Sequence, residues 1–84
     1  MKGKQIMSTI NCTSFKNRPE MAREFIRMNG IKAAFVWRNG PKDWEVLEGD
    51  PELKAGFSAG RFSTRREANA LRDEINAIIQ QVTA

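Results

Sequence analysis

Hydrophobic and polar positions alternate along residues 5–12, which is the period of a β-strand with one buried face. Two segments instead carry apolar residues three and four positions apart, which predicts helices over about 18–29 and 65–82. Further short runs predict three more strands, at 31–38, 43–48 and 57–62. The turn formers in GDPELKAG, residues 49–56, predict a surface loop before the last strand.

Each predicted helix has an apolar stripe that indicates a buried side. In the first helix the stripe consists of Met21, Phe25 and Met28, with Ala22 beside them. In the second helix it consists of Ala68, Leu71, Ile75, Ile78 and Val82. Polar residues line the second stripe on both sides, with Arg65, Asn69, Arg72 and Asn76 on a cationic edge and Glu67, Glu74 and Gln81 on an anionic edge.

Short motifs predict where the helices begin and end. Asn17 and Glu20 have the spacing of a capping box, and Thr64 and Glu67 repeat that spacing at the second helix. Asn29-Gly30 predicts a left-handed stop for the first helix, because glycine adopts positive φ without a steric cost.

The segment 31–48 predicts a β-hairpin. If residues 39–42 form its loop, Arg38 faces Asp43 and Trp37 faces Trp44. In the same register Phe35 faces Val46, so that Phe35, Trp37, Trp44 and Val46 share one face of the sheet. Such opposite-charge and apolar pairs each contribute about 0.2–1 kcal/mol across a strand pair.

The elements together predict an α+β fold in the order β-α-β-β-β-α. Two amphipathic helices on one face of an antiparallel sheet of three to four strands bury both stripes. At 84 residues the chain has room for a single domain, 1–84, with residues 1–4 expected to be flexible.

Two strand-to-helix joints in the chain resemble each other. CTSFKNRPEMA at 12–22 and AGRFSTRREAN at 59–69 share a Phe, an Arg and a Glu at an offset of 47 residues. The pattern predicts two similar βα units with a hairpin between them. Favourable capping chemistry that arose twice independently explains the same residues equally well.

The joints CTSFKNRPEMA and AGRFSTRREANALRDEI resemble those of SPOR domains, bacterial repeats that bind peptidoglycan glycan stripped of peptides. In the second joint, AGRF followed by Ala68, Leu71 and Ile75 matches the small residue, Gly, Phe and helix core of that family. The resemblance implies the same fold logic, with glycan binding as its functional expectation, and no ligand residue is carried over.

The order α-β-β-β-α from residue 18 onward is also similar to that of double-stranded-RNA-binding domains. Gly40-Pro41 lies where those domains have a Gly-Pro loop, and STRREAN resembles their basic helix start. Asp43 stands at the place of their loop His, and Asn69 stands at the place of their final Lys. This resemblance implies RNA binding.

The composition predicts that the protein is not an enzyme and holds no metal or cofactor. The chain has no His, and Cys12 is its single Cys, so a Cys–His pair, a Ser–His triad and a zinc site are excluded. It also lacks the G-x-x-x-x-G-K phosphate loop. The N-terminal MKGKQIMSTINC has no apolar run typical of a secretory signal, and no run is long enough to span a membrane, which predicts a cytoplasmic location.

The charge is distributed unevenly and indicates an anionic partner. Residues 1–42 carry nine Lys/Arg against two Glu, a net charge of +7, whereas residues 43–54 have a net charge of −4. The expected function is nucleic-acid binding through backbone or shape contacts, at cations that converge near the two helix starts. These cations are Lys16, Arg18, Arg61, Arg65, Arg66 and Arg72. Trp37 and Trp44 are candidates for base stacking, although a role in the core is the more common one for such a pair.

An equally supported alternative is a regulator or inhibitor, of the kind that phages and other mobile elements encode, which binds a protein partner. The acidic stretch 43–52 is suited to bind a basic protein surface, and the basic portion beside it is suited to bind an acidic one. The long stripe of the second helix also predicts a homodimer through residues 65–82, with Ile79 and Val82 at its seam.

Overall fold

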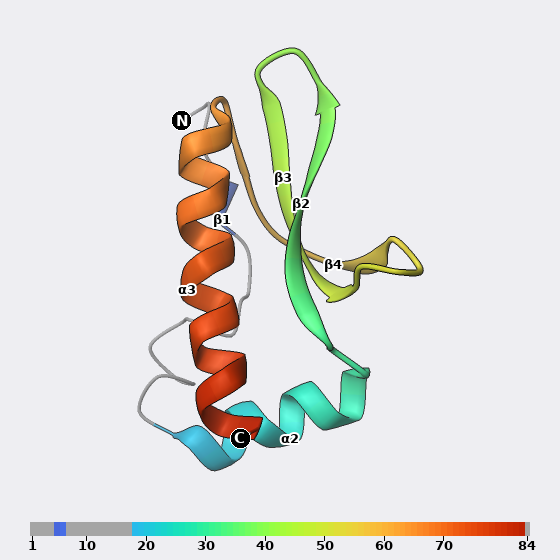
Figure 1. Ribbon diagram of the computed structural model, residues 1–84, viewed down its shortest axis with the longest axis vertical. Helices are drawn as coiled ribbons and strands as arrows, with labels where there is room; N and C mark the ends of the chain where they lie inside the picture. The colour runs from blue at the N-terminus through green and yellow to red at the C-terminus, as the bar shows by residue number, and fades with distance from the viewer. Residues whose placement is uncertain (1–4, 7–17, 84) are drawn as a thin grey trace.

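The computed structural model describes residues 5–6 and 18–83, which form one antiparallel sheet and two helices (Figure 1). Along the chain the elements are β1 (Gln5–Ile6), α2 (Pro19–Asn29), β2 (Ala33–Gly40), β3 (Asp43–Asp50), β4 (Ala55–Phe62) and α3 (Arg65–Thr83). The strand order in the sheet is β1-β4-β3-β2. The predicted α+β class is confirmed, with the order α-β-β-β-α after the short β1. The predictions for residues 1–4, for the strand beyond Ile6 and for Cys12 lie outside the described residues.

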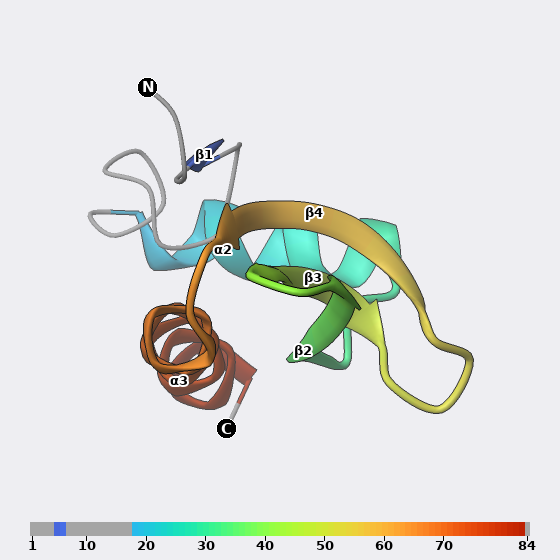
Figure 2. The same cartoon turned by 90° about the horizontal axis from the view of Figure 1, so that it is seen from above.

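Helix α3 packs on the sheet, and α2 crosses its end. Figure 2 shows α3 along one side of β2, β3 and β4, all of which it contacts. Helix α2 lies across the C-terminal part of α3 (Figure 1). There the Nε of Arg23 donates a hydrogen bond of 2.7 Å to the carbonyl oxygen of Val82. None of the helices in the described part of the chain is long and apolar enough to cross a membrane.

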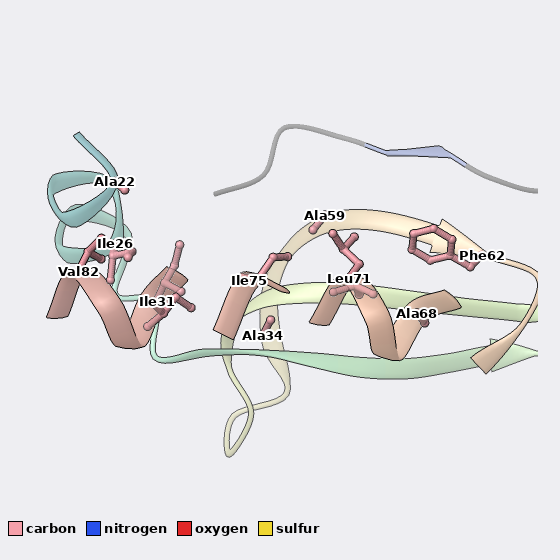
Figure 3. Packing of buried hydrophobic residues seen from close by; sticks show 12 residues of the cluster. Ala22, Ile26, Ile31, Ala34, Ala59, Phe62, Ala68, Leu71, Ile75 and Val82 are labelled. Atoms are coloured by element: carbon pink, nitrogen blue, oxygen red, sulfur yellow. The ribbon is translucent and has the colours of Figure 1, made fainter. Parts of the chain in front are cut away.

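The predicted stripe of α3 forms the centre of the core (Figure 3). Ala68, Leu71, Ile75 and Val82 are buried as predicted, whereas the fifth buried residue is Ile79 and the predicted Ile78 is only partly buried. The buried residues pack against buried side chains of the sheet and of α2. Ile79 is 8% exposed and Val82 is 5% exposed. The predicted dimer seam at these two residues is therefore wrong, because the fold of a single chain already buries them.

The free edge of β2 is held by a side chain of α3. Asn76 accepts a hydrogen bond of 2.7 Å from the backbone N–H of Ala34 and donates one of 3.1 Å to the carbonyl oxygen of Ala34. Because β2 is an edge strand, these backbone groups point away from β3. The predicted cationic edge of α3, to which Asn76 belongs, thus faces β2.

The β2–β3 hairpin forms, but the predicted register is wrong by one residue. Arg38 pairs with Trp44, Trp37 pairs with Glu45, and the register shifts between Arg38 and Gly40. The turn contains two residues, 41–42, instead of the predicted four. Asn39 lies at the register shift in β2 and has no cross-strand partner in β3. Since a shift of one residue exchanges the faces of a strand, Trp37 and Trp44 lie on opposite faces of the sheet.

Strands β3 and β4 extend into the segment that was predicted as a loop. Only residues 51–54 form the turn, while Gly49 and Gly56 pair with each other inside the hairpin. An ideal Cβ at Gly49 would lie 2.1 Å from the carbonyl oxygen of Ala55. The two glycines of the predicted loop thus allow the two strands to approach closely, because they have no Cβ.

Helix α2 begins and packs differently from the prediction. Its N-cap is Arg18, which makes no side-chain capping bond. The capping box predicted for Asn17 and Glu20 involves Asn17, which lies outside the described residues. Pro19 has no N–H and a φ that suits the first helical position, which moves the cap to the residue before it. The predicted stop is confirmed, because Gly30 has a φ of 62° in the left-handed region.

The buried side of α2 agrees only in part with the predicted one. Ala22 and Ile26 are buried, whereas Met21 is 45% exposed and Met28 is 71% exposed. Small Ala22 allows α2 to lie close to α3. Phe25 is partly buried and packs against the core as predicted, so Met21 and Met28 are the members of the predicted stripe that are exposed.

Candidate nucleic-acid interface

Two guanidinium groups lie against the ring of Trp44. The Cζ of Arg38 is 5.1 Å from the ring centroid, and the Cζ of Arg65 is 5.6 Å from it. The fold brings them together because Arg38 is the cross-strand partner of Trp44 and Arg65 is the first residue of α3. We call these three residues the arginine–tryptophan cluster. Each such contact contributes about 0.5–1 kcal/mol at an exposed site and restricts where the guanidinium points.

Arg72 lies further along the same edge of α3 as Arg65. Its side chain is 36% exposed, and its Nη2 lies 2.9 Å from the carboxylate of Asp73. Arg65 and Arg72 are seven residues apart, so they project from the same side of the helix. Asn76, which bonds to β2, continues this edge and shows that it borders the edge strand.

A side-chain cap occupies the backbone N–H of Glu67 at the start of α3. The N–H of Glu67 donates to the hydroxyl of Thr64 at 3.3 Å, and that hydroxyl donates to the carboxylate of Glu67 at 3.0 Å. The capping box predicted for α3 is therefore confirmed. A carboxylate already occupies the positive end of the helix dipole, so phosphate contacts at this end depend on the guanidinium groups.

Arg61 lies on the other face of the sheet and is bound to an acid. Its Nη2 is 2.5 Å from Oδ2 of Asp43, and its Nε donates to Oδ1 of Asp43 at 3.2 Å. The hydrogen bond from Arg61 lowers the pKa of Asp43 below its ordinary value, although partial desolvation opposes it. Asp43 thus pairs with Arg61 and not with Arg38 as predicted.

The acidic stretch 43–52 does not form a separate acidic surface. Asp43 is paired with Arg61, and the carboxylate of Asp50 lies 3.4 Å from the Nζ of Lys32. Glu48 is buried, with 1% of its surface exposed. Basic residues from other elements thus offset much of the local charge of −4.

Trp37 lies on the face of the sheet opposite α3, which we call the open face; Phe35 and Leu47 pair with each other on the same face. Trp37 is 40% exposed, and the Nζ of Lys54 is 5.9 Å from its ring centroid. Trp44, in contrast, is half-buried beside α3. Trp37 therefore does not belong to the core, and the two rings are not adjacent.

The cations of the two predicted helix starts do not converge. Arg18 lies at the start of α2, at the end of the molecule opposite the start of α3 (Figure 1), and its Nη1 is 3.5 Å from the Sδ of Met21. Arg66 is exposed on α3 next to Arg65. Lys16 lies outside the described residues.

One residue of the arginine–tryptophan cluster, Arg38, was not among the cations that the sequence predicted for the nucleic-acid interface. The predicted register assigned it to Asp43, and a register shifted by one residue places it opposite Trp44 instead. No protein-family model, curated protein or solved structure matches this chain. Its site is therefore interpreted from its own geometry.

Proposed function

We propose that this protein binds nucleic acid through the phosphate backbone, with Arg38 and Arg65 as the principal contacts. The supporting observation is that both guanidinium groups are held by the ring of Trp44 and not by a carboxylate. Among the described residues, neither takes part in a salt bridge, whereas Arg27, Arg61 and Arg72 each do.

The ring of Trp44 orients the two cations without neutralising them. A guanidinium offers several N–H donors in a plane, which suits bidentate contacts to phosphate oxygens. Holding it in place before binding reduces the entropy that is lost on complex formation. Arg66, which is exposed beside Arg65, extends the positive charge at the start of α3. Backbone contacts of this kind bind without sequence preference, typically with a Kd of about 10⁻⁴–10⁻⁶ M at physiological salt.

Fluorescence anisotropy with labelled DNA and RNA, at low and at physiological salt, tests the proposal. Arg38→Gln and Arg65→Gln each remove one cation and are expected to weaken binding and to reduce its dependence on salt. The matched control is Arg27→Gln, because Arg27 is an exposed arginine on α2 that pairs with Glu24. No binding at low salt, or equal losses in all three variants, contradicts the proposal.

The two exposed methionines of α2 favour a second candidate function, the binding of a protein partner as a regulator or inhibitor. Met21 and Met28 are exposed apolar residues on either side of the partly buried Phe25, and methionine is common at surfaces that bind other proteins. A partner that binds the wild type and Arg65→Gln but not Met28→Gln supports this function. A partner that Met28→Gln retains with unchanged affinity contradicts it.

A further inference from the structure

The edge strand β2 presents different chemistry on its two sides. Trp37 and Arg38 are successive residues of a strand, so their side chains lie on opposite faces of the sheet. Arg38 lies on the helix side together with Arg65, and Trp37 lies on the open face. Two guanidinium groups and one aromatic ring therefore flank the same edge of the sheet.

Trp37 is the tryptophan whose ring is accessible to a ligand. Its side chain is 40% exposed, whereas the ring of Trp44 is in contact with two guanidinium groups. Neither of the helices in the described part of the chain lies over the open face (Figure 2). Aromatic rings that are exposed on a sheet face stack well on unpaired bases.

Two lysines near this edge adopt a backbone conformation that lysine rarely has. Lys42, in the β2–β3 turn, has a φ of 57°, and Lys54, in the β3–β4 turn, has a φ of 54°. Glycine and asparagine suit such positions better. Both turns nonetheless place a cation there, and the ammonium of Lys54 lies 5.9 Å from the Trp37 ring centroid.

Of the two acids beside Trp37, Asp43 has a cationic partner and Glu45 has a neutral one. Asp43 binds Arg61, and Glu45 accepts a hydrogen bond of 3.0 Å from the side chain of Asn39. Among the described residues, Arg38, Arg65 and the two turn lysines take part in no salt bridge. The amide of Asn39 is uncharged, so it does not offset the charge of Glu45, which is the cross-strand partner of Trp37. The four cations outnumber this one carboxylate, so the net charge along the β2 edge is positive and complements a phosphate chain.

We propose that the β2 edge binds single-stranded nucleic acid in preference to a duplex. One base stacks on Trp37, and the phosphates of the strand lie near Arg38 and Arg65 on one side and Lys54 on the other. The bases of a duplex are paired and stacked on one another, so they cannot reach the ring. This inference rests on the proposed function and adds the class of nucleic acid that is bound.

The test compares a single-stranded oligothymidine with a duplex of the same length, by anisotropy across a salt series. Trp37→Ala is expected to weaken binding of the single strand by about 5- to 100-fold, the range for loss of one stacked base. It is expected to leave the affinity for the duplex and the salt dependence unchanged, because no phosphate contact is removed. Arg38→Gln is expected to weaken both and to reduce the salt slope by about 0.7 on the single strand.

Two further variants control for general effects of the substitution. Trp37→Phe keeps a stacking ring and is expected to retain most of the affinity. Phe57→Ala removes an aromatic residue that is 54% exposed on β4 and is expected to change nothing. Thermal melting of Trp37→Ala, followed by circular dichroism, checks that the variant is folded under the assay conditions.

The outcomes separate this inference from the proposed function. If the wild type binds single strand and duplex equally and Trp37→Ala matches it, the preference for single strands is refuted while backbone binding stands. If no nucleic acid is bound at low salt, both proposals fail. If light scattering shows a wild-type dimer that Trp37→Ala dissociates, the open face joins two copies of the chain, and the stacking role is refuted.

Discussion

The side chain of Asn76 offers a direct measure of how firmly the site's edge strand is held. In Asn76→Ala, the N–H and the carbonyl of Ala34 lose hydrogen bonds of 2.7 and 3.1 Å. At about 1 kcal/mol for each bond the loss is about 2 kcal/mol. The higher helix propensity of alanine raises the free energy of unfolding by about 0.6 kcal/mol and so offsets part of this loss. We therefore expect the free energy of unfolding to fall by about 1.5 kcal/mol.

Thermal and urea unfolding, followed by circular dichroism, measure this change. For a domain of this size, 1 kcal/mol corresponds to about 4–8 °C, so the expected fall in Tm is about 6–12 °C. Gln80→Ala is the matched control, because Gln80 is exposed on the same helix and its loss tests propensity alone. A Tm of Asn76→Ala at or above that of the wild type refutes the reasoning that α3 holds β2 by this contact.

Three other substitutions test features of the turns and the sheet. Lys42→Gly relieves a φ of 57°, so it is expected to stabilise the fold by about 0.5–1 kcal/mol in urea unfolding while weakening nucleic-acid binding; a loss of stability contradicts this. The lowered pKa of Asp43 contributes stability above its unfolded pKa near 3.8, and this is lost as the pH falls through the lower folded value. Melting curves at acidic pH are therefore expected to show a shallower decline in Asp43→Asn, and an identical decline contradicts the Arg61 pairing. Gly49→Ala places a Cβ against the carbonyl oxygen of Ala55, and we expect a large loss of stability in the same urea assay, whereas wild-type stability contradicts the close strand approach.

The sequence predicted the elements well because their signals are local. The α3 stripe and the Thr64–Glu67 cap lie within a few turns of one helix, and both are observed. The strands β2 and β3 were predicted, but their register depends on the turn. A two-residue turn with Lys42 at positive φ has no clear sequence signature, since glycine or asparagine is the usual residue there.

The candidate site depends on contacts between elements, which the sequence specifies less directly. Arg65, Arg72 and Trp44 were candidates from charge and aromatic character alone. Arg38 was not, because one residue of register decides whether it meets Asp43 or Trp44. In α2, the prediction placed Met21 and Met28 on the buried side, whereas packing buries Ile26 together with Ala22.

The measurement that tests the central claim most directly is the salt dependence of nucleic-acid binding by the wild type, Arg38→Gln and Arg65→Gln. Binding through Arg38 and Arg65 predicts a log–log slope that is shallower by about 0.7 in each variant on single strands. It also predicts that Arg27→Gln keeps the wild-type slope. Absence of binding at low salt, or the same slope in the wild type and both cluster variants, would contradict the claim.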